Sequence, residues 1–350
     1  MDRPLIRLVA ATSVFALSLM GTSACSKKST AAGGSGLKPE QVKVALVPGG
    51  SHPYFQPWKA AATQAKADFG LGDVTFNETS GWDQSKENDV LTSLAAQGYN
   101  AFGVFGVAPE SINSTFSTLK AKGFHVASLA SCPAGGTDTA DFCLSTDVQQ
   151  AAYKAAKAAI SAMGGQGVLV HLTGNKVDAN TQRRIAGVQQ AVDETGGRVR
   201  LLDTVTDIDA DLQTAQKAVA DLLAAKGSQI NGIVSTAYNS AVASAAAVKQ
   251  DKLPIKVVAT DDDPTIISGI KDGSIAATVV QNPVAQAYVG SYALMKLATG
   301  CTMKQPGVTV DSGSFVVTDA DVATYDQDRG AKAATLKQDF DTKYLSCPAK

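Results

Sequence analysis

Aromatic side chains gather in two short stretches of the chain, HPYF and GWD, and their chemistry suits the binding of a ring-shaped ligand. An aromatic ring covers the apolar face of such a ligand while polar groups elsewhere take its hydroxyls. We therefore treat Tyr54, Phe55 and Trp82 as candidate ligand-binding residues. The alternative is that these rings lie on helix faces in the core, which is the interpretation we favour for Trp58.

Hydrogen-bonding side chains gather in the second half of the chain. Arg183 and Arg184 lie in the run TGNKVDANTQRRIAGVQQAV, and a guanidinium offers a rigid fork of donors that can hold two ligand oxygens at once. Tyr238 and Asn239 follow a later apolar run, and Gln281 follows another. These positions are polar where the corresponding positions of the first half are aromatic.

Three consecutive aspartates, Asp261 to Asp263, precede Pro264. Asp261 could accept a pair of hydrogen bonds from ligand hydroxyls. Its alternative role is to cap a helix, which Asp263 before Pro264 fits better. Calcium binding by the three carboxylates is disfavoured, because the alternating spacing of an EF-hand loop is missing.

The elements that must position these residues are short β-branched runs that alternate with Ala-rich amphipathic stretches, the pattern of a parallel α/β sheet. A first series of strands is predicted at residues 42–47, 73–77, 101–105, 125–129 and 142–145. A second series is predicted at residues 167–172, 198–205, 230–235, 255–259 and 275–280, with helices near 178–195, 209–226 and 239–250. Two similar series predict two similar lobes. In an open parallel sheet, ligands bind outside the carboxyl ends of the strands, where the candidate residues fall.

Residues 1–24 have the features of an export signal. Arg3 and Arg7 give a positive start, and the apolar run that follows is long enough for a signal peptide but short for a membrane-spanning helix. Small residues before Cys25 resemble a bacterial lipobox, in which the cysteine is lipidated, although Thr22 stands where leucine is usual. The alternative is an ordinary signal peptide cleaved near residue 24. Both interpretations place the mature protein outside the cytoplasm, and the first anchors it to the outer face of the cell membrane.

The cysteine count agrees with export. Four cysteines remain when Cys25 is set aside, and an even number in an exported protein predicts two disulfides. Among the three possible pairings we favour the local one, Cys132 with Cys143 and Cys301 with Cys347. Four buried free thiols are the alternative.

Several function classes lack support in the sequence. The three histidines and the absence of GxSxG, HExxH and Walker A patterns give no indication of an enzyme. No cofactor is expected, and no metal site, because no zinc-type spacing of Cys and His occurs. The formal net charge of −1 and the scattered basic residues argue against nucleic-acid binding.

Four motifs in order along the chain resemble the type 1 periplasmic substrate-binding proteins of the ribose-binding kind, which serve ABC transporters. They are VALVPGGSHPYF from Val44, QRRIAGVQQAV from Gln182, VVATDDDP from Val257 and GSIAATVVQNP from Gly273. The resemblance covers the whole mature chain. It implies two doubly wound parallel-sheet lobes joined by a three-strand hinge, with the ligand in the cleft between them.

The resemblance also implies which residues contact the ligand. In the first lobe the contacts fall on His52, Tyr54 and Phe55. In the second lobe they fall on Arg184, Asp261 and Gln281, with Ile208 and residues 237–239 nearby.

Three polar residues of the ribose-type binders, at two places in the sequence, are replaced in this chain. Ala130 and Ser131 stand where the family has an Asp-Arg pair, and Phe105 or Gly106 stands where it has Asn. These departures indicate a smaller or differently hydroxylated ligand, such as a polyol or deoxysugar, or recognition through Trp82 and Ser128 instead.

The implied mechanism is closure of the two lobes about crossings near residues 145–147, 281–283 and 307–311. The implied domains are a signal peptide (1–24), a lipid-anchored linker (25–40), an N-terminal lobe (41–146 and 282–308) and a C-terminal lobe (147–281 and 309–347). We expect a monomer that delivers a small carbohydrate or polyol to a permease. The alternative is a sensor of a similar ligand that acts on a membrane kinase or chemoreceptor.

Overall fold

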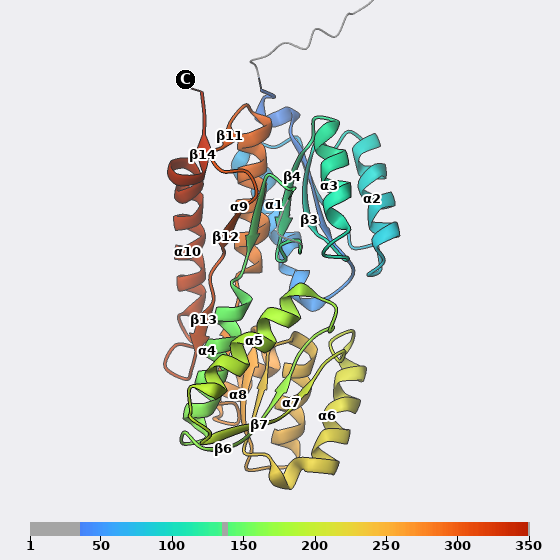
Figure 1. Ribbon diagram of the computed structural model, residues 1–350. Coiled ribbons are helices and arrows are strands. Elements are labelled where there is room, and N and C mark those ends of the chain that lie inside the picture. The colour runs from blue at the N-terminus through green and yellow to red at the C-terminus, as the bar shows by residue number, and fades with distance from the viewer. Residues whose placement is uncertain (1–35, 135–138, 349–350) are drawn as a thin grey trace, which may run out of the picture. The chain divides into compact units, whose positions relative to one another are not determined.

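The computed structural model describes residues 36–134 and 139–348, so the predicted signal peptide and Cys25 lie outside the described residues. Two six-stranded sheets dominate this part of the chain (Figure 1). The first has the order β12-β5-β4-β3-β1-β2, and all its neighbouring strands are parallel. Its strands are β1 (Lys43–Pro48), β2 (Asp73–Phe76), β3 (Ala101–Phe105), β4 (His125–Leu129), β5 (Phe142–Ser145) and β12 (Val308–Asp311).

The second sheet has the order β13-β10-β9-β8-β6-β7. Its strands are β6 (Gly167–Leu172), β7 (Val199–Val205), β8 (Gly232–Ser235), β9 (Lys256–Thr260), β10 (Ala277–Val280) and β13 (Phe315–Val317). The edge strand β13 is antiparallel to β10, and the other pairs are parallel. A small third sheet pairs β11 (Thr302–Met303) with β14 (Leu345–Ser346).

Helices cover both faces of each sheet, as the buried side chains show. The first sheet lies between α1 (Pro57–Phe69) with α9 (Pro283–Ala298) on one face and α2 (Gln84–Ala96) with α3 (Ile112–Ala121) on the other. The second sheet has α6 (Leu212–Lys226), α7 (Tyr238–Gln250) and α8 (Pro264–Lys271) on one face. Its other face is covered by α4 (Val148–Ala162) and α5 (Ala179–Asp193). The doubly wound fold class is therefore confirmed.

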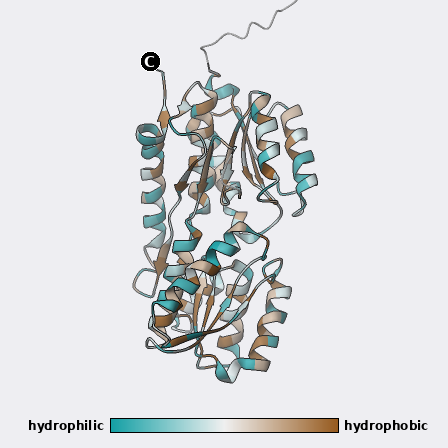
Figure 2. Cartoon of the chain, in the orientation of Figure 1, coloured by the Kyte–Doolittle hydropathy of each residue, from teal (hydrophilic) through white to brown (hydrophobic). Residues whose placement is uncertain are grey.

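The ten predicted strands are all present, and the largest shift of an end is two residues, at β8 (230 against 232) and β10 (275 against 277). The pattern predicts them because most are buried runs rich in apolar residues, although β2 and most of β7 are only partly buried. Figure 2 shows the same pattern as hydrophobic residues concentrated on the strands of both sheets. Within the described residues, no helix combines the length and the hydropathy that a membrane span requires.

Two of the three crossings between the lobes fall where the resemblance placed them. The chain leaves β5 at Ser145 and enters α4 at Val148, and it leaves β10 at Val280 and enters α9 at Pro283. The third lies later than expected, at residues 312–314, because β12 pairs with β5 in the first sheet before β13 joins the second. The boundary drawn at residue 308 is therefore corrected, since residues 309–311 belong to the first sheet.

A further connection between the lobes is made by α10 (Tyr325–Asp339), which the strand pattern did not indicate. Tyr325 at its start packs against the core of the second lobe, and Leu336 near its end lies in the core of the first. Figure 1 shows α10 running beside both sheets. The segment that follows, with Phe340 and Leu345, also belongs to the core of the first lobe.

The described residues contain two disulfides, with the favoured pairing of Cys132 with Cys143 and Cys301 with Cys347. The second joins the end of α9 to the end of the described chain. The backbone N–H of Leu37 donates to the carbonyl of Ala298 at 2.9 Å, so the start of the described chain lies at the same place.

Candidate functional site

A cavity of about 340 Å³ is lined by residues of both lobes. The first lobe contributes an aromatic and aliphatic wall. The second lobe contributes most of the hydrogen-bonding groups. Because both sheets present the carboxyl ends of their parallel strands here, the site lies where an open α/β sheet binds ligands.

The aromatic wall begins in the loop after β1. The side chain of His52 caps the short helix η2 (Pro53–Phe55), since its Nδ1 accepts a hydrogen bond from the N–H of Tyr54 at 3.2 Å. Tyr54 and Phe55 therefore point from the first turn of this helix, and Pro53 fixes its start. The hydroxyl of Tyr54 donates to Gln286 on α9 at 2.9 Å, and burial raises the pKa of that hydroxyl.

Trp82 completes this wall through a close approach to two glycines. A Cβ on Gly50 would lie 2.6 Å from the indole nitrogen of Trp82, and a Cβ on Gly49 would lie 2.5 Å from Val107. The glycines therefore allow the indole to lie directly on the backbone. The Trp82 ring is also 6.3 Å from that of Phe55 and 5.9 Å from that of Phe105, so neighbouring rings fix its position.

Arg184 projects from α5, whose N-terminus is capped by Asp178 through the N–H of Asn180 at 3.0 Å. Its guanidinium is half-buried and makes no hydrogen bond or ion pair with any residue in the described ranges. An unpaired guanidinium facing a cavity retains its full set of donors for a ligand.

Asp261 is buried, and both of its carboxylate oxygens accept from Nε2 of Gln281, at 3.0 and 3.3 Å. The pKa of Asp261 is raised to about 7, and burial is the largest cause. The hydrogen bond from Gln281 and the charge of Arg184 lower this pKa, whereas the charge of Asp262 raises it. The capping role belongs to Asp263, which accepts from the N–H of Thr265 at 2.8 Å. Asp263, not Asp261, therefore caps α8, and Asp261 lines the cavity.

Left-handed backbone conformations concentrate at this cavity. Five non-glycine residues in the described part of the chain have a positive φ, and four of them line the cavity, namely Trp82, Ala130, Asp207 and Asp261. Such conformations cost free energy in residues with a side chain, and they cluster at binding and active sites. The strain is independent support for a functional site here.

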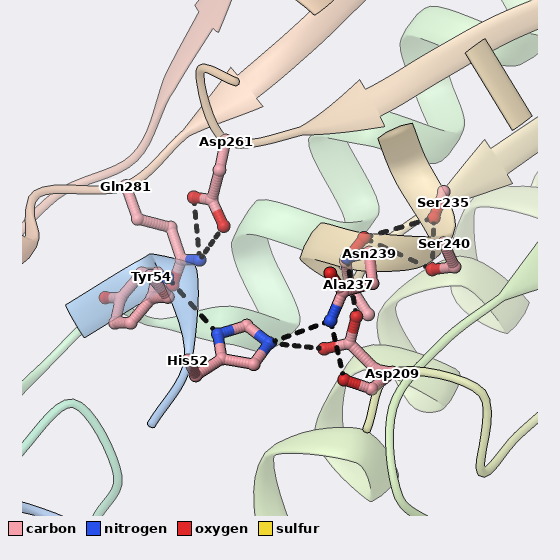
Figure 3. A network of polar contacts seen from close by, with 9 residues as sticks. All are labelled: His52, Tyr54, Asp209, Ser235, Ala237, Asn239, Ser240, Asp261 and Gln281. Atoms are coloured by element: carbon pink, nitrogen blue, oxygen red, sulfur yellow. Dashed lines mark hydrogen bonds and ion pairs between the residues drawn. The ribbon is translucent and has the colours of Figure 1, made fainter. Parts of the chain in front are cut away.

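Direct contacts already join the lobes across the cavity (Figure 3). Nε2 of His52 lies 3.4 Å from Oδ2 of Asp209 and 3.4 Å from Nδ2 of Asn239. The backbone N–H of Asn239 donates to Oδ1 of Asp209 at 2.6 Å, which orients the carboxylate. A second contact is the hydrogen bond from Nδ2 of Asn180 to the carbonyl of Ala130 at 3.2 Å.

Most of the predicted site residues meet at this cavity. The residues that line it are His52, Tyr54, Phe55, Trp82, Arg184, Tyr238, Asp261 and Gln281. Asn239 does not line it but contacts His52 and Asp209. Trp58 is fully buried in the core, which is the interpretation favoured from the sequence. Ser128 is also buried, and it does not line the cavity.

Several lining residues were missed by the sequence analysis. They include Val107, Val177, Asp178, Asn180, Asp207 and Asp209. Asp207 and Asp209 follow the end of β7, so the rule that ligands bind after parallel strands could have found them. No sequence signal marks Val177, which lies in the loop between β6 and α5.

Comparison with known proteins agrees with this architecture. The chain matches the family model described as periplasmic binding protein domain over residues 44–302. A search of curated proteins found no match. The match to this family model shows that the chain belongs to the periplasmic binding proteins, and its two parallel-sheet lobes are of type 1, the ribose-binding kind.

Similar solved structures share the fold. One is an ABC transporter solute-binding protein of Burkholderia graminis in complex with D-arabinose (TM-score 0.72, 22% identity, 81% of this chain and 97% of that one). Another, from Actinobacillus succinogenes, has bound D-allose (TM-score 0.73, 20% identity, 81% and 100%). A third is the Caulobacter myo-inositol binding protein with myo-inositol (TM-score 0.71, 18% identity, 81% and 95%).

Proposed function

We propose that this protein is an extracytoplasmic substrate-binding lipoprotein that captures a small carbohydrate or polyol and delivers it to the permease of an ABC importer. The observation that carries the proposal is the cavity itself, with aromatic rings on one wall and carboxylates, amides and the unpaired Arg184 on the other. Rings cover the apolar face of a sugar, and charged groups bind its hydroxyls. The ligands of the three similar structures belong to the same chemical class.

Capture would proceed by closure of the lobes. A ligand that contacts both walls binds the closed arrangement more tightly than an open one, and this difference in affinity shifts the equilibrium toward closure. The crossings at residues 145–147, 281–283 and 312–314 are the segments that would bend. His52 and Asp209 would meet only when the lobes are close.

The test is a thermal-shift screen of the purified full chain against pentoses, hexoses, polyols, inositols and furanosyl signalling molecules. A binder present at 100 times its dissociation constant stabilises the folded state by about 2.7 kcal/mol, which raises the unfolding temperature clearly. The proposal fails if none of these compounds shifts the midpoint and native mass spectrometry finds no retained carbohydrate.

Delivery to a permease is tested separately in cells. Deletion of the gene should abolish uptake of the radiolabelled compound identified by the screen. A sensor that acts on a membrane kinase or chemoreceptor would instead leave uptake intact and abolish the response to that compound.

The lipid anchor at Cys25 is the remaining part of the proposal, and it rests on the sequence alone. We expect a radioactive fatty acid to label the chain and the Cys25→Ser variant to lose the label and leave the membrane fraction. Equal labelling of both proteins would show that Cys25 is not the attachment site.

A further inference from the structure

The wall that the first lobe presents to the cavity has almost no side-chain group free to hydrogen-bond a hydroxyl. The hydroxyl of Tyr54 is used by Gln286, and the two ring nitrogens of His52 face the N–H of Tyr54 and the Asp209–Asn239 pair. The indole nitrogen of Trp82 lies close to Gly50, 2.6 Å from where a Cβ would be, and it has no hydrogen-bond partner in the described part of the chain. The rest of the wall is Phe55, Phe105, Val107 and Ala130, which are apolar.

The second lobe presents the opposite chemistry. Among the described residues, Arg184 has no hydrogen-bond or ion-pair partner, and the carboxylate of Asp261 accepts from the side chain of Gln281 alone. Asp178, Asp207 and Asp209 add carboxylates to the same wall. A ligand with hydroxyls on every side would leave those that face the first lobe without partners, which costs free energy in a buried site.

Exposed apolar side chains are a second, independent observation. Among the large hydrophobic residues exposed in the described part of the chain, the two with the largest exposed fractions are Val177 at 79% and Trp82 at 41%. Both line this cavity, one from each lobe. Isolated exposed hydrophobic residues are ordinary, but two that face one cavity from opposite sides indicate an apolar group between them.

We propose that the ligand carries an apolar substituent, a deoxy carbon, alkyl group or aryl ring, that lies on Phe55, Trp82, Phe105 and Val107 while its hydroxylated part faces Arg184 and Asp261. This inference rests on the proposed function and narrows it. Binding would cover the exposed surfaces of Trp82 and Val177, and burial of apolar surface would favour the substituted ligand over its hydroxylated analogue.

The test compares matched pairs of compounds by calorimetry on the purified full chain. The pairs are L-fucose with L-galactose, L-rhamnose with L-mannose, phenyl β-D-glucopyranoside with D-glucose, and phenyl β-D-galactopyranoside with D-galactose. We expect the apolar member of at least one pair to bind about 10- to 100-fold more tightly than its partner, the range given by burial of a methyl group up to a phenyl ring. Tighter binding by the hydroxylated member of every pair that binds would overturn the inference and leave the proposed function standing.

Two variants locate the preference. Trp82→Ala should reduce the ratio of affinities within a pair about tenfold, and Val107→Thr, which keeps the shape and adds a hydroxyl, should reduce it in the same direction. Leu212→Ala is the matched control, because Leu212 is exposed to 39% but does not line the cavity. If the ratio survives both changes, the substituent does not lie on this wall. If no member of any pair binds, and the wider screen also finds no carbohydrate or polyol, the proposed function itself fails.

Discussion

The guanidinium of Arg184 faces a cavity without a hydrogen-bond or ion-pair partner in the described part of the chain, while its neighbour Arg183 is exposed and does not line the cavity. We expect Arg184→Ala to raise the dissociation constant of the best carbohydrate from the thermal screen about 10- to 100-fold, because hydrogen bonds from a charged group contribute about 1.5–3 kcal/mol. Arg183→Ala should change it less than about twofold. Isothermal titration calorimetry measures both, and an unchanged constant for Arg184→Ala would remove this residue from the site.

The raised pKa of Asp261 makes the stability of the unliganded protein depend on pH. Because the folded-state pKa of about 7 lies above the usual value near 4, the folded protein retains a proton that the unfolded chain loses between these pH values. The contribution of this group to the free energy of unfolding therefore falls as pH rises from 4 to 7, by about 2–4 kcal/mol.

Asp261→Asn should remove that decrease, so the variant should gain stability relative to the unaltered protein as pH rises. Urea unfolding at pH 4.5 and pH 7.5 measures the difference. Asp221→Asn on the exposed face of α6 is the control and should show no such gain. An equal pH response of the Asp261→Asn variant and the unaltered protein would contradict the shift.

At the scale of elements, α5 carries Arg184 and packs closely on α4 through Gly187. A Cβ at Gly187 would lie 2.2 Å from the carbonyl oxygen of Gln149 and 3.0 Å from the nitrogen of Tyr153, both backbone atoms of α4. Because backbone atoms cannot turn away as a side chain can, Gly187→Ala must push the helices apart.

We expect Gly187→Ala to lower the free energy of unfolding by about 1–3 kcal/mol and to weaken ligand binding, since Arg184 lies one turn away on the same helix. Gly330→Ala on α10 is the matched control, because a Cβ there meets nothing within 4 Å. That change should be neutral or stabilising by up to about 1 kcal/mol. Urea unfolding measures the free energy of unfolding of both variants. An equal change in the two would show that the close approach of α5 to α4 does not depend on glycine at position 187.

The sequence pattern predicted those strands whose own residues and near neighbours mark them as strands. Strands β1 to β10 are short runs rich in apolar residues, and all but β4 and β5 are separated by helices, so each could be predicted from its own residues and its near neighbours. Strand β12 could not, because its four residues form a strand only by pairing with β5, from which the whole second sheet up to β10 separates it in sequence. The same reason explains the site. Trp82 and Asp209 follow strands and could be placed by that rule, whereas the contacts of Asp209 with Asn239 and His52 join residues distant in sequence and could not be predicted.

At the scale of the whole molecule, α10 connects the lobes through side-chain contacts as well as through its backbone. In the second lobe Arg329 forms an ion pair with Asp262 at 2.9 Å, next to Asp261. In the first lobe Lys337 lies 5.0 Å from the ring centroid of Tyr292. The lobe closure that we propose would therefore require a shift or bend of α10 relative to one lobe.

The Cys301–Cys347 disulfide fixes the segment that follows α10 to the first lobe and closes a loop of 46 residues. The chain-entropy relation predicts that Cys301→Ser with Cys347→Ser lowers the free energy of unfolding by about 4 kcal/mol. Neither cysteine lines the cavity, so carbohydrate affinity should change less than about twofold. Urea unfolding and calorimetry measure the two quantities, and a loss of affinity with unchanged stability would contradict this assignment.

The contacts of Leu37 with Ala298 and of Cys347 with Cys301 place both ends of the described chain on one lobe. An immobilised support or fluorescent fusion attached at either end would therefore hold the first lobe still and leave the second lobe as the moving body. A single dye on an exposed position of the second lobe, such as Asp221 on α6, would then report ligand capture as a change in distance from a fixed surface. Under the proposed closure, attachment next to Leu37 or Cys347 would suit the molecule to use as a surface-mounted sensor.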